Sequence, residues 1–148
     1  MDIRVQEAAF EPGVETARFV ARQTSAGAVV TFTGLTRDEG GTLSAMEIEH
    51  YPGMTEKALT QIAEDAQARW SLDDILILHR HGRLAPTEPI MMVATASRHR
   101  KAAFEAADFL MDYLKSRAPF WKKELGPDGA TWVAAKEEDE AALSDWSR

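Results

Sequence analysis

The sequence predicts an α+β fold in which helices and strands are mixed along the chain. Apolar residues recur at helical spacing over residues 54–70, and a long helix is predicted over 98–117. Runs of β-branched and aliphatic residues at 28–33 and 75–78 are typical of buried strands. Because these elements do not alternate strictly, the pattern favours α+β over a doubly wound parallel sheet.

Five elements are predicted in the first half of the chain. Pro12 suits the first turn of a helix, and β-branched residues mark the strands. The Pro52-Gly53 pair ends a strand and begins the next helix. The predicted elements are a strand at 3–6, a helix from 12 to about 24, strands at 28–33 and 43–51 joined by a Gly-flanked loop at 34–41, and a helix at 54–70.

The second half predicts three strands, a long helix and an acidic tail. Pro86 and Pro89 mark a turn before a strand, and Pro119 stops the long helix. The predicted elements are strands at 75–81 and 90–96, a helix at 98–117, a short strand at 131–134, and an Ala-rich acidic tail at 136–148 with a short helix.

The length of 148 residues fits a single domain spanning residues 1–148. There is no cysteine, which excludes a disulfide scaffold, a Cys-ligated metal site and a cysteine nucleophile. The first residues lack the apolar stretch of a signal peptide, and no apolar run approaches the length of a membrane span. We therefore expect a cytoplasmic protein that does not associate with membranes.

The net charge of −7 argues against general binding to nucleic acid. The charge is unevenly spread, however, because residues 98–123 hold seven basic and three acidic side chains and so carry +4. A basic segment on an acidic chain indicates a local anionic ligand. The alternative is a solvated helix face, which is the usual meaning of a charge run.

The start of the predicted long helix is the first candidate site. Ser97 is expected to cap the helix, and Arg98, His99, Arg100 and Lys101 crowd its first turn. Cations at this end oppose the helix dipole, while the free N–H groups there favour a phosphate or carboxylate. Side chains that point into water or pair with distant acids explain the pattern equally well.

The end of the same helix is the second candidate site. Lys115 precedes two aromatic residues, Phe120 and Trp121, and two further lysines. An apolar wall beside cations suits a flat anionic heterocycle, and neighbouring cations lower the pKa of a buried lysine toward that of a base. From these residues alone, the favoured interpretation is an ordinary helix C-terminus, with Phe120 and Trp121 in the hydrophobic core.

The two candidate sites are too far apart for one small ligand. Arg100 and Lys115 are 15 residues apart, which is about 22 Å along a continuous helix. Either the chain has two sites, or two chains pack so that one helix start meets the other helix end.

Other residues give weaker signals. Arg37 lies in the Gly-flanked loop, where the backbone can approach a ligand. His79 and His81 lie on one face of a predicted strand, but no third ligand is evident, so no metal site is expected. Phosphate-binding loops, dinucleotide fingerprints and nucleophile elbows are absent from the sequence.

Six sequence blocks together resemble a known family. They lie at residues 30–37, 47–54, 79–84, 96–100, 104–106 and 111–124. The most specific is the last, MDYLKSRAPFWKKE. In this order the blocks resemble the large, catalytic subunit of molybdopterin synthase, over residues 28–135.

The resemblance implies an α/β hammerhead core with an additional antiparallel β subdomain. It also implies conversion of cyclic pyranopterin monophosphate (precursor Z) to molybdopterin by insertion of two dithiolene sulfurs. The donor in this family is the C-terminal Gly-Gly thiocarboxylate of a small ubiquitin-like subunit. The implied assembly is a homodimer of large subunits within a heterotetramer, and no resident cofactor is implied. With no cysteine, the chain requires such an external sulfur donor.

Family positions map onto seven residues of this chain. The resemblance implies that Lys115 and Lys122 are catalytic. The implied substrate-binding residues are Arg37, His99, Arg100, Lys123 and Glu124. To join the two ends of the helix, we expect His99 and Arg100 of one chain to meet Arg37, Lys115 and Lys122 of another. The alternative function is a non-catalytic module that binds a phosphorylated metabolite or a partner's tail.

Overall fold

The computed structural model describes residues 1–41, 43–133 and 137–147, which form two four-stranded sheets and four α-helices. The predicted α+β class is confirmed. The helices are α1 (Pro12–Ala21), α2 (Met54–Trp70), α3 (Arg100–Arg117) and α4 (Glu137–Ala142). Two 3₁₀ turns, η1 (Glu39–Gly41) and η2 (Leu143–Trp146), complete the helical elements of these ranges.

The first sheet is mixed and has the strand order β1-β4-β6-β2. Its strands are β1 (Asp2–Gln6), β4 (Asp74–Arg80), β6 (Pro89–Ser97) and β2 (Ala28–Leu35). β1 pairs with β4 in parallel, whereas β4 and β2 flank β6 antiparallel. The central strands β4 and β6 are almost entirely buried, which explains their continuous apolar sequence.

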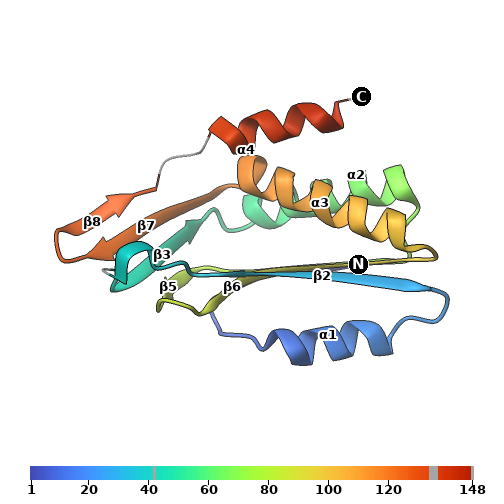
Figure 1. Ribbon diagram of the computed structural model, residues 1–148, viewed down its shortest axis with the longest axis horizontal. Helices are drawn as coiled ribbons and strands as arrows, with labels where there is room; N and C mark the ends of the chain where they lie inside the picture. Colours follow the sequence, from blue (N-terminus) through green and yellow to red (C-terminus); the bar gives the residue numbers. More distant parts are fainter. Residues whose placement is uncertain (42, 134–136, 148) are drawn as a thin grey trace.

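The second sheet is wholly antiparallel and has the order β5-β3-β7-β8. Its strands are β5 (Gly82–Leu84), β3 (Ala45–His50), β7 (Phe120–Gly126) and β8 (Gly129–Trp132). Figure 1 shows this sheet at one end of the molecule, beyond the helices. It fits the expected additional antiparallel subdomain.

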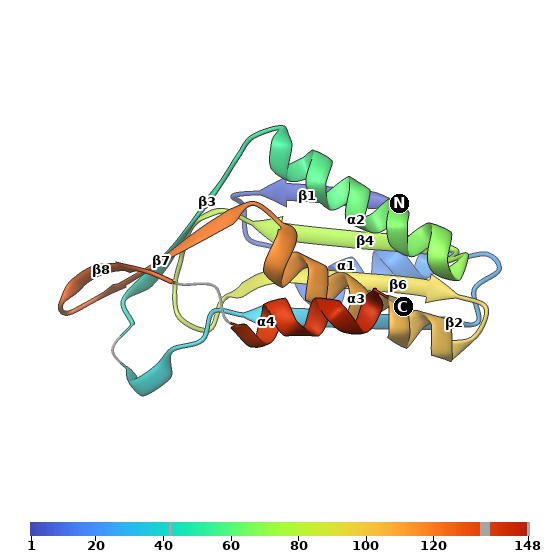
Figure 2. The same ribbon diagram turned by 90° about the horizontal axis from the view of Figure 1, so that it is seen from above.

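Helices cover both faces of the first sheet. α1 lies on one face, while α2 and α3 lie on the other (Figure 1). Seen from above, α4 runs beside α3 (Figure 2). The main core lies between α2, α3 and the sheet, where Leu59, Ile77, Val93 and Leu110 are all fully buried. Each such side chain stabilises the fold by about 1.5–3 kcal/mol relative to an exposed one.

Two strands escaped the sequence prediction. β7 carries Lys122, Lys123 and Glu124, and such charges mask the strand preference of its aromatic start. β5 is only three residues long. Both are strands because each pairs with β3, and β7 pairs also with β8, so the sheet supplies the hydrogen bonds.

Several predicted boundaries also shift. The first helix ends at Ala21 rather than near residue 24, because the Gln23 side chain donates hydrogen bonds to the Phe19 carbonyl and to Asp74. The last predicted strand begins earlier, at Gly129. Residue 134, its predicted end, and residue 136, the predicted start of the tail, lie outside the described residues. In the described helices, no segment is long and apolar enough to cross a membrane.

A buried carboxylate ties the N-terminal strand and α1 to β4. Asp74 accepts hydrogen bonds from Arg22 Nε at 2.6 Å, Gln23 Nε2 at 2.8 Å and the Ile75 N–H at 2.9 Å. The amino group of Met1 lies 3.1 Å from its Oδ1. Burial alone raises the pKa of Asp74, but these donors outweigh it and lower that pKa to about 2.

We predict that Asp74→Asn lowers the free energy of unfolding at neutral pH by about 2 kcal/mol. The folded-state pKa lies below the unfolded one, so the contribution is complete above about pH 4 and is lost as the pH falls toward 2. Urea unfolding from neutral to acidic pH should give a flatter acid dependence for the variant. Asp73→Asn, which changes an exposed carboxylate bonded to Ser25, is the control. Equal acid slopes for Asp74→Asn and wild type would contradict this account.

Candidate active site

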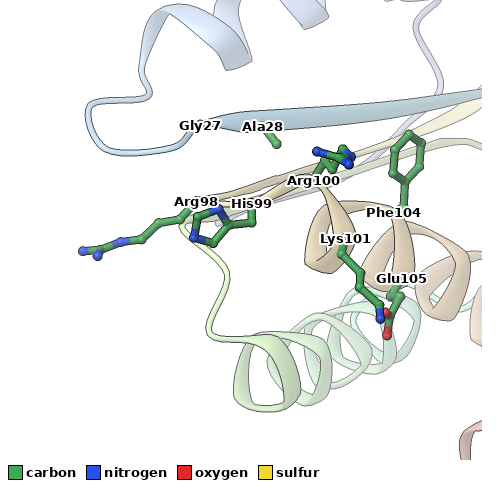
Figure 3. A pocket seen from close by; sticks show the side chains of 8 residues that line it. All are labelled: Gly27, Ala28, Arg98, His99, Arg100, Lys101, Phe104 and Glu105. Atoms are coloured by element: carbon green, nitrogen blue, oxygen red, sulfur yellow. The ribbon is translucent and has the colours of Figure 1, made fainter.

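A cationic pocket lies at the N-terminus of α3, with a volume of about 850 Å³. Its lining combines a strand edge with the first turns of the helix: Gly27, Ala28, Arg98, His99, Arg100, Lys101, Phe104 and Glu105. In Figure 3 Arg100 and Phe104 stand on the side of α3 that faces β2, while Lys101 and Glu105 point to the opposite side. We call this the N-terminal pocket. It brings together the predicted residues His99 and Arg100.

The junction between β6 and α3 differs from the prediction. Ser97 was expected to cap the helix, but it is the last residue of β6, and its hydroxyl donates to the His99 carbonyl. His99 is the N-cap and makes no side-chain capping hydrogen bond, and α3 begins at Arg100. Arg98 and His99 therefore form a two-residue connection before the helix rather than its first turn.

Gly27 holds this connection against β2. Its N–H donates to the Ser97 carbonyl at 2.9 Å. A Cβ at this position would overlap the carbonyl oxygen of Arg98, so only glycine permits the close approach. The backbone of Gly27 thus sets where Arg98 and His99 lie.

The electrostatics of the N-terminal pocket favour an anion. The structure describes every residue of α3, and the first turn of this helix carries no acidic side chain. Arg98, His99, Arg100 and Lys101 are exposed there. The positive charges of Arg98, Arg100 and Lys101 add to the partial positive charge of the helix N-terminus, so a phosphate or carboxylate would relieve an unfavourable arrangement.

The second candidate site lies at the other end of α3. Lys115 is in the last turn of the helix and is exposed. The helix ends at Arg117, and β7 begins at Phe120 after a connection of two residues. Lys122 follows on β7 and is half-buried. Lys115 and Lys122 therefore lie on either side of one short connection. No part of the chain that the structure describes buries Lys115.

The alternation of β7 divides the predicted residues between two faces. Lys122 is paired with Ile48, and Glu124 with Met46, and both partners on β3 are buried. Residues opposite each other on antiparallel strands share a face. Lys122 and Glu124 thus share one face of β7, where Lys122 is half-buried and Glu124 is exposed, and Lys123 lies on the other, outer face.

The outer side of the second sheet is aromatic. The Lys123 ammonium lies 4.5 Å from the centre of the Trp132 ring, and Tyr51 and Trp121 are 5.7 Å apart. Trp121 is exposed, whereas Phe120 is half-buried and packs against the core. The two aromatic residues therefore differ. Phe120 is a core residue, as the alternative interpretation of the sequence predicts, and Trp121 borders a hollow. That hollow, of about 340 Å³, is lined by Glu49, His50, Tyr51, Trp121 and Trp132.

His50 and His79 lie beside Phe120, and His81 lies against His50, but within the described residues they form no metal site. His79 is buried in β4, and its Nδ1 donates to the Arg80 carbonyl at 2.7 Å. Burial, helped by the charge of Lys122, lowers the pKa of His79 to about 3. The rings of His50 and His81 are 4.1 Å apart, and burial also lowers the pKa of His81. Within the described ranges, no three potential ligands cluster as a metal site.

Arg37 is carried by the loop after β2, and its neighbours hold that loop in place. The Thr36 N–H donates to the Glu88 carbonyl at 2.9 Å, and the Thr87 N–H donates to the Thr36 carbonyl at 2.7 Å. The Asp38 carboxylate accepts the Leu43 N–H at 2.9 Å. The backbone around Arg37 is thus fixed, and the side chain itself is exposed.

The predicted residues form two groups, and α3 separates them. The N-terminal pocket holds His99 and Arg100, and Lys115 stands at the far end of the same continuous helix. The 15-residue separation corresponds to about 22 Å of helix. Neither group can therefore reach one small ligand together with the other inside a single chain.

Sequence reasoning missed some residues that shape these sites. Phe104, 60% exposed in the N-terminal pocket, was read only as part of a motif. The prediction places no element at Gly27, although a glycine just before a strand permits a close backbone approach. His79 and Thr55 make contacts to residues far away in sequence, and no local pattern could reveal them.

Comparison with known proteins gives a consistent result. The family model described as MoaE protein matches residues 5–117. The molybdopterin synthase catalytic subunit of Cereibacter sphaeroides is 65% identical, covering 99% of this chain and all of that protein. The solved molybdopterin biosynthesis MoaE protein of Burkholderia ambifaria is 50% identical, with a TM-score of 0.86, covering 99% of this chain and 98% of that one.

A more distant structure shares the fold. It is the complex of subunits 1 and 2 of the molybdopterin-converting factor from Helicobacter pylori. The identity is 18% and the TM-score 0.74, with 91% of this chain and 90% of that chain covered.

We predict that Gly27→Ala weakens anion binding in the N-terminal pocket about tenfold, because the methyl group must displace the Arg98 carbonyl and with it His99. Titration with inorganic pyrophosphate, followed by NMR or calorimetry, measures the affinity. Gly13→Ala is the matched control, since no atom lies within 4 Å of the added methyl group on α1. Unchanged affinity in a folded Gly27→Ala protein would show that this backbone approach does not position the pocket.

Proposed function

The chain belongs to the MoaE family, and from this membership we propose how its residues divide the work of molybdopterin synthesis. Its activity is that of a molybdopterin synthase catalytic subunit, a sulfurtransferase of molybdenum cofactor biosynthesis. This overrides the alternative of a non-catalytic binding module. The reaction inserts two sulfurs into precursor Z, and the small subunit supplies them as a C-terminal thiocarboxylate.

Lys115 and Lys122 carry the chemistry in this proposal. The observation that supports it best is their position on either side of the short connection between α3 and β7. Two amines there can approach one thiocarboxylate from a helix end and from a strand. Lys115 meets the carbonyl or acts as general acid and base, and Lys122 stabilises the negative charge that develops on the transferred group.

Arg37, His99 and Arg100 bind the substrate in this proposal. The cyclic phosphate of precursor Z is an anion, and the N-terminal pocket offers cations together with free helix N–H groups. Phosphate bound there leaves the pterin ring beside the exposed Phe104.

The complete site is shared between two chains. Since α3 keeps Arg100 and Lys115 about 22 Å apart, Arg37, Lys115 and Lys122 of one protomer face His99 and Arg100 of its partner. The working assembly is a heterotetramer, with a dimer of catalytic subunits and a small subunit at each far end.

Lys123 and Glu124 were also predicted to bind substrate, and their positions on β7 set different conditions. Glu124 shares the face of Lys122, so its contact with substrate would occur in the same site. Lys123 lies over Trp132 on the outer face, and it reaches a substrate only from that side.

A cytoplasmic location is likewise proposed, as suits bacterial biosynthetic enzymes; cell fractionation with an antibody to the chain tests it.

We predict a division of kinetic effects between the two groups. Lys115→Ala should lower kcat by about 10²-fold or more with little change in KM, because it removes the reacting amine. Arg100→Ala should chiefly raise KM for precursor Z, by about tenfold or more, because it removes a charge-assisted contact to phosphate. Turnover with the thiocarboxylated small subunit, read as the fluorescent oxidation product of molybdopterin, measures both. Loss of small-subunit binding alone in both variants would contradict these roles.

We also predict that Lys115→Ala and Arg100→Ala restore each other when they are assayed at a precursor Z concentration well below the raised KM of Arg100→Ala, where each variant alone has low activity. A mixed dimer of Lys115→Ala and Arg100→Ala protomers has one site with both residues intact. Random reassortment should therefore recover about a quarter of wild-type activity. Mixtures of Lys115→Ala with Lys122→Ala are the control. Each site takes both lysines from one protomer, so every site in a mixed dimer of these two variants lacks one lysine. Absence of recovery with Arg100→Ala, despite exchange of protomers, would mean that the site lies within one chain.

A further inference from the structure

A buried hydroxyl joins three elements beside the lysine residues. Thr55, at the start of α2, is fully buried. Its Oγ1 accepts the Tyr51 N–H at 2.9 Å and donates to the Pro119 carbonyl at 3.0 Å. The hydroxyl thus connects the end of β3, the start of α2 and the connection between α3 and β7.

The connection at Pro119 sets the relation between the two lysines. Lys115 lies four residues before Pro119, and Lys122 lies three residues after it. The turn is tight, because the Phe120 N–H donates to the Ala118 carbonyl at 2.8 Å. Any rotation of this turn would move the end of α3 relative to β7, and with it the spacing of the two amines.

A second contact, made by β4, holds the same turn. The ring of Phe120 stacks on His79 of β4, with ring centres 3.8 Å apart and an angle of 16° between the planes. His79 is itself buried. The turn is therefore held by a hydroxyl from α2 and by a ring from the central sheet.

We propose that Thr55 is a positioning residue for sulfur transfer, which fixes the Pro119 turn and thereby the relative placement of Lys115 and Lys122. The inference rests on the proposed roles of those lysines. Valine has nearly the same shape as threonine, but it would leave the Tyr51 N–H and the Pro119 carbonyl without this partner in a dry interior. The turn would then shift to find other partners, and small misplacements of reacting groups slow chemistry strongly.

The test compares three variants in the turnover assay. Thr55→Val should lower kcat about tenfold, while KM for precursor Z and for the small subunit stays within about twofold. Thr55→Ser keeps the hydroxyl and should restore kcat to near the wild-type value. Thr60→Val is the matched control, because the Thr60 hydroxyl donates only along α2, to the Glu56 carbonyl at 2.8 Å. Its kcat should equal that of wild type.

Thermal unfolding separates positioning from simple stabilisation. If Thr55→Val lowers the melting temperature but keeps the wild-type kcat, or if Thr55→Ser is as slow as Thr55→Val, the proposal is overturned. Should Thr55→Val fail to fold, His79→Leu removes the second contact to the turn and should also lower kcat about tenfold. Wild-type kcat in that variant overturns the proposal.

Lys115→Ala, assayed in parallel, tells this inference apart from the proposed function. A fast Thr55→Val enzyme beside an inactive Lys115→Ala enzyme overturns the positioning role alone. An active Lys115→Ala enzyme overturns the catalytic role of the lysine, and the positioning role with it.

Discussion

The packing of α3 on β6 is the constraint on which the rest of the structure depends. Three alanines on one face of the helix, Ala103, Ala106 and Ala107, are buried and let the helix approach the sheet closely. The fully buried Thr95 hydroxyl donates to the Ala103 carbonyl at 2.7 Å, which fixes the helix along β6. Because the helix is fixed on the sheet, its first turn lies at one end of the molecule and its last turn lies near the middle, where β7 leads into the second sheet (Figure 2). A reaction that needs both sets of charges has to use two chains.

The two ends differ in electrostatic cost. Lys115 and Arg117 in the last turn interact favourably with the helix dipole, so these cations require no ligand to be stable. Arg100 and Lys101 at the first turn oppose the dipole, with a cost of about 0.3–1 kcal/mol each when exposed. The N-terminal pocket therefore gains more from an anion than the other end does. This difference agrees with phosphate binding at the start of α3 and amine chemistry at its end.

The sequence predicted those parts of the fold in which local pattern and environment agree. β4 and β6 are buried on both sides and α2 and α3 have one apolar face, so continuous apolar runs indicated the two strands and patterning indicated the two helices. β7 was missed because its pairing with β3 comes from the tertiary structure, and without that strand the opposite faces of Lys122 and Lys123 could not be deduced. Local charge patterns already indicated Arg37, His99, Arg100 and Lys115, and the resemblance added their roles. Contacts such as Thr55 with Pro119, 64 residues apart, leave no local signal.

In the acidic tail, the ion pair with α3 and the contacts that attach the tail to α3 are made by different residues. Glu140 binds Arg117 with oxygen distances of 2.7 and 2.9 Å, but both side chains are more than half exposed, so this pair contributes little. The firmer contacts are made further on. Leu143 is buried, and the Trp146 ring packs edge-on against Phe109 while its Nε1 donates to Asp112 at 2.6 Å. Since Asp112 lies one turn before Lys115, the segment 137–147 is attached mainly through apolar burial to the part of α3 that carries the lysine. The tail therefore contributes to the rigidity of that helix end, and its negative charge offsets Arg117 without covering Lys115, which stays exposed.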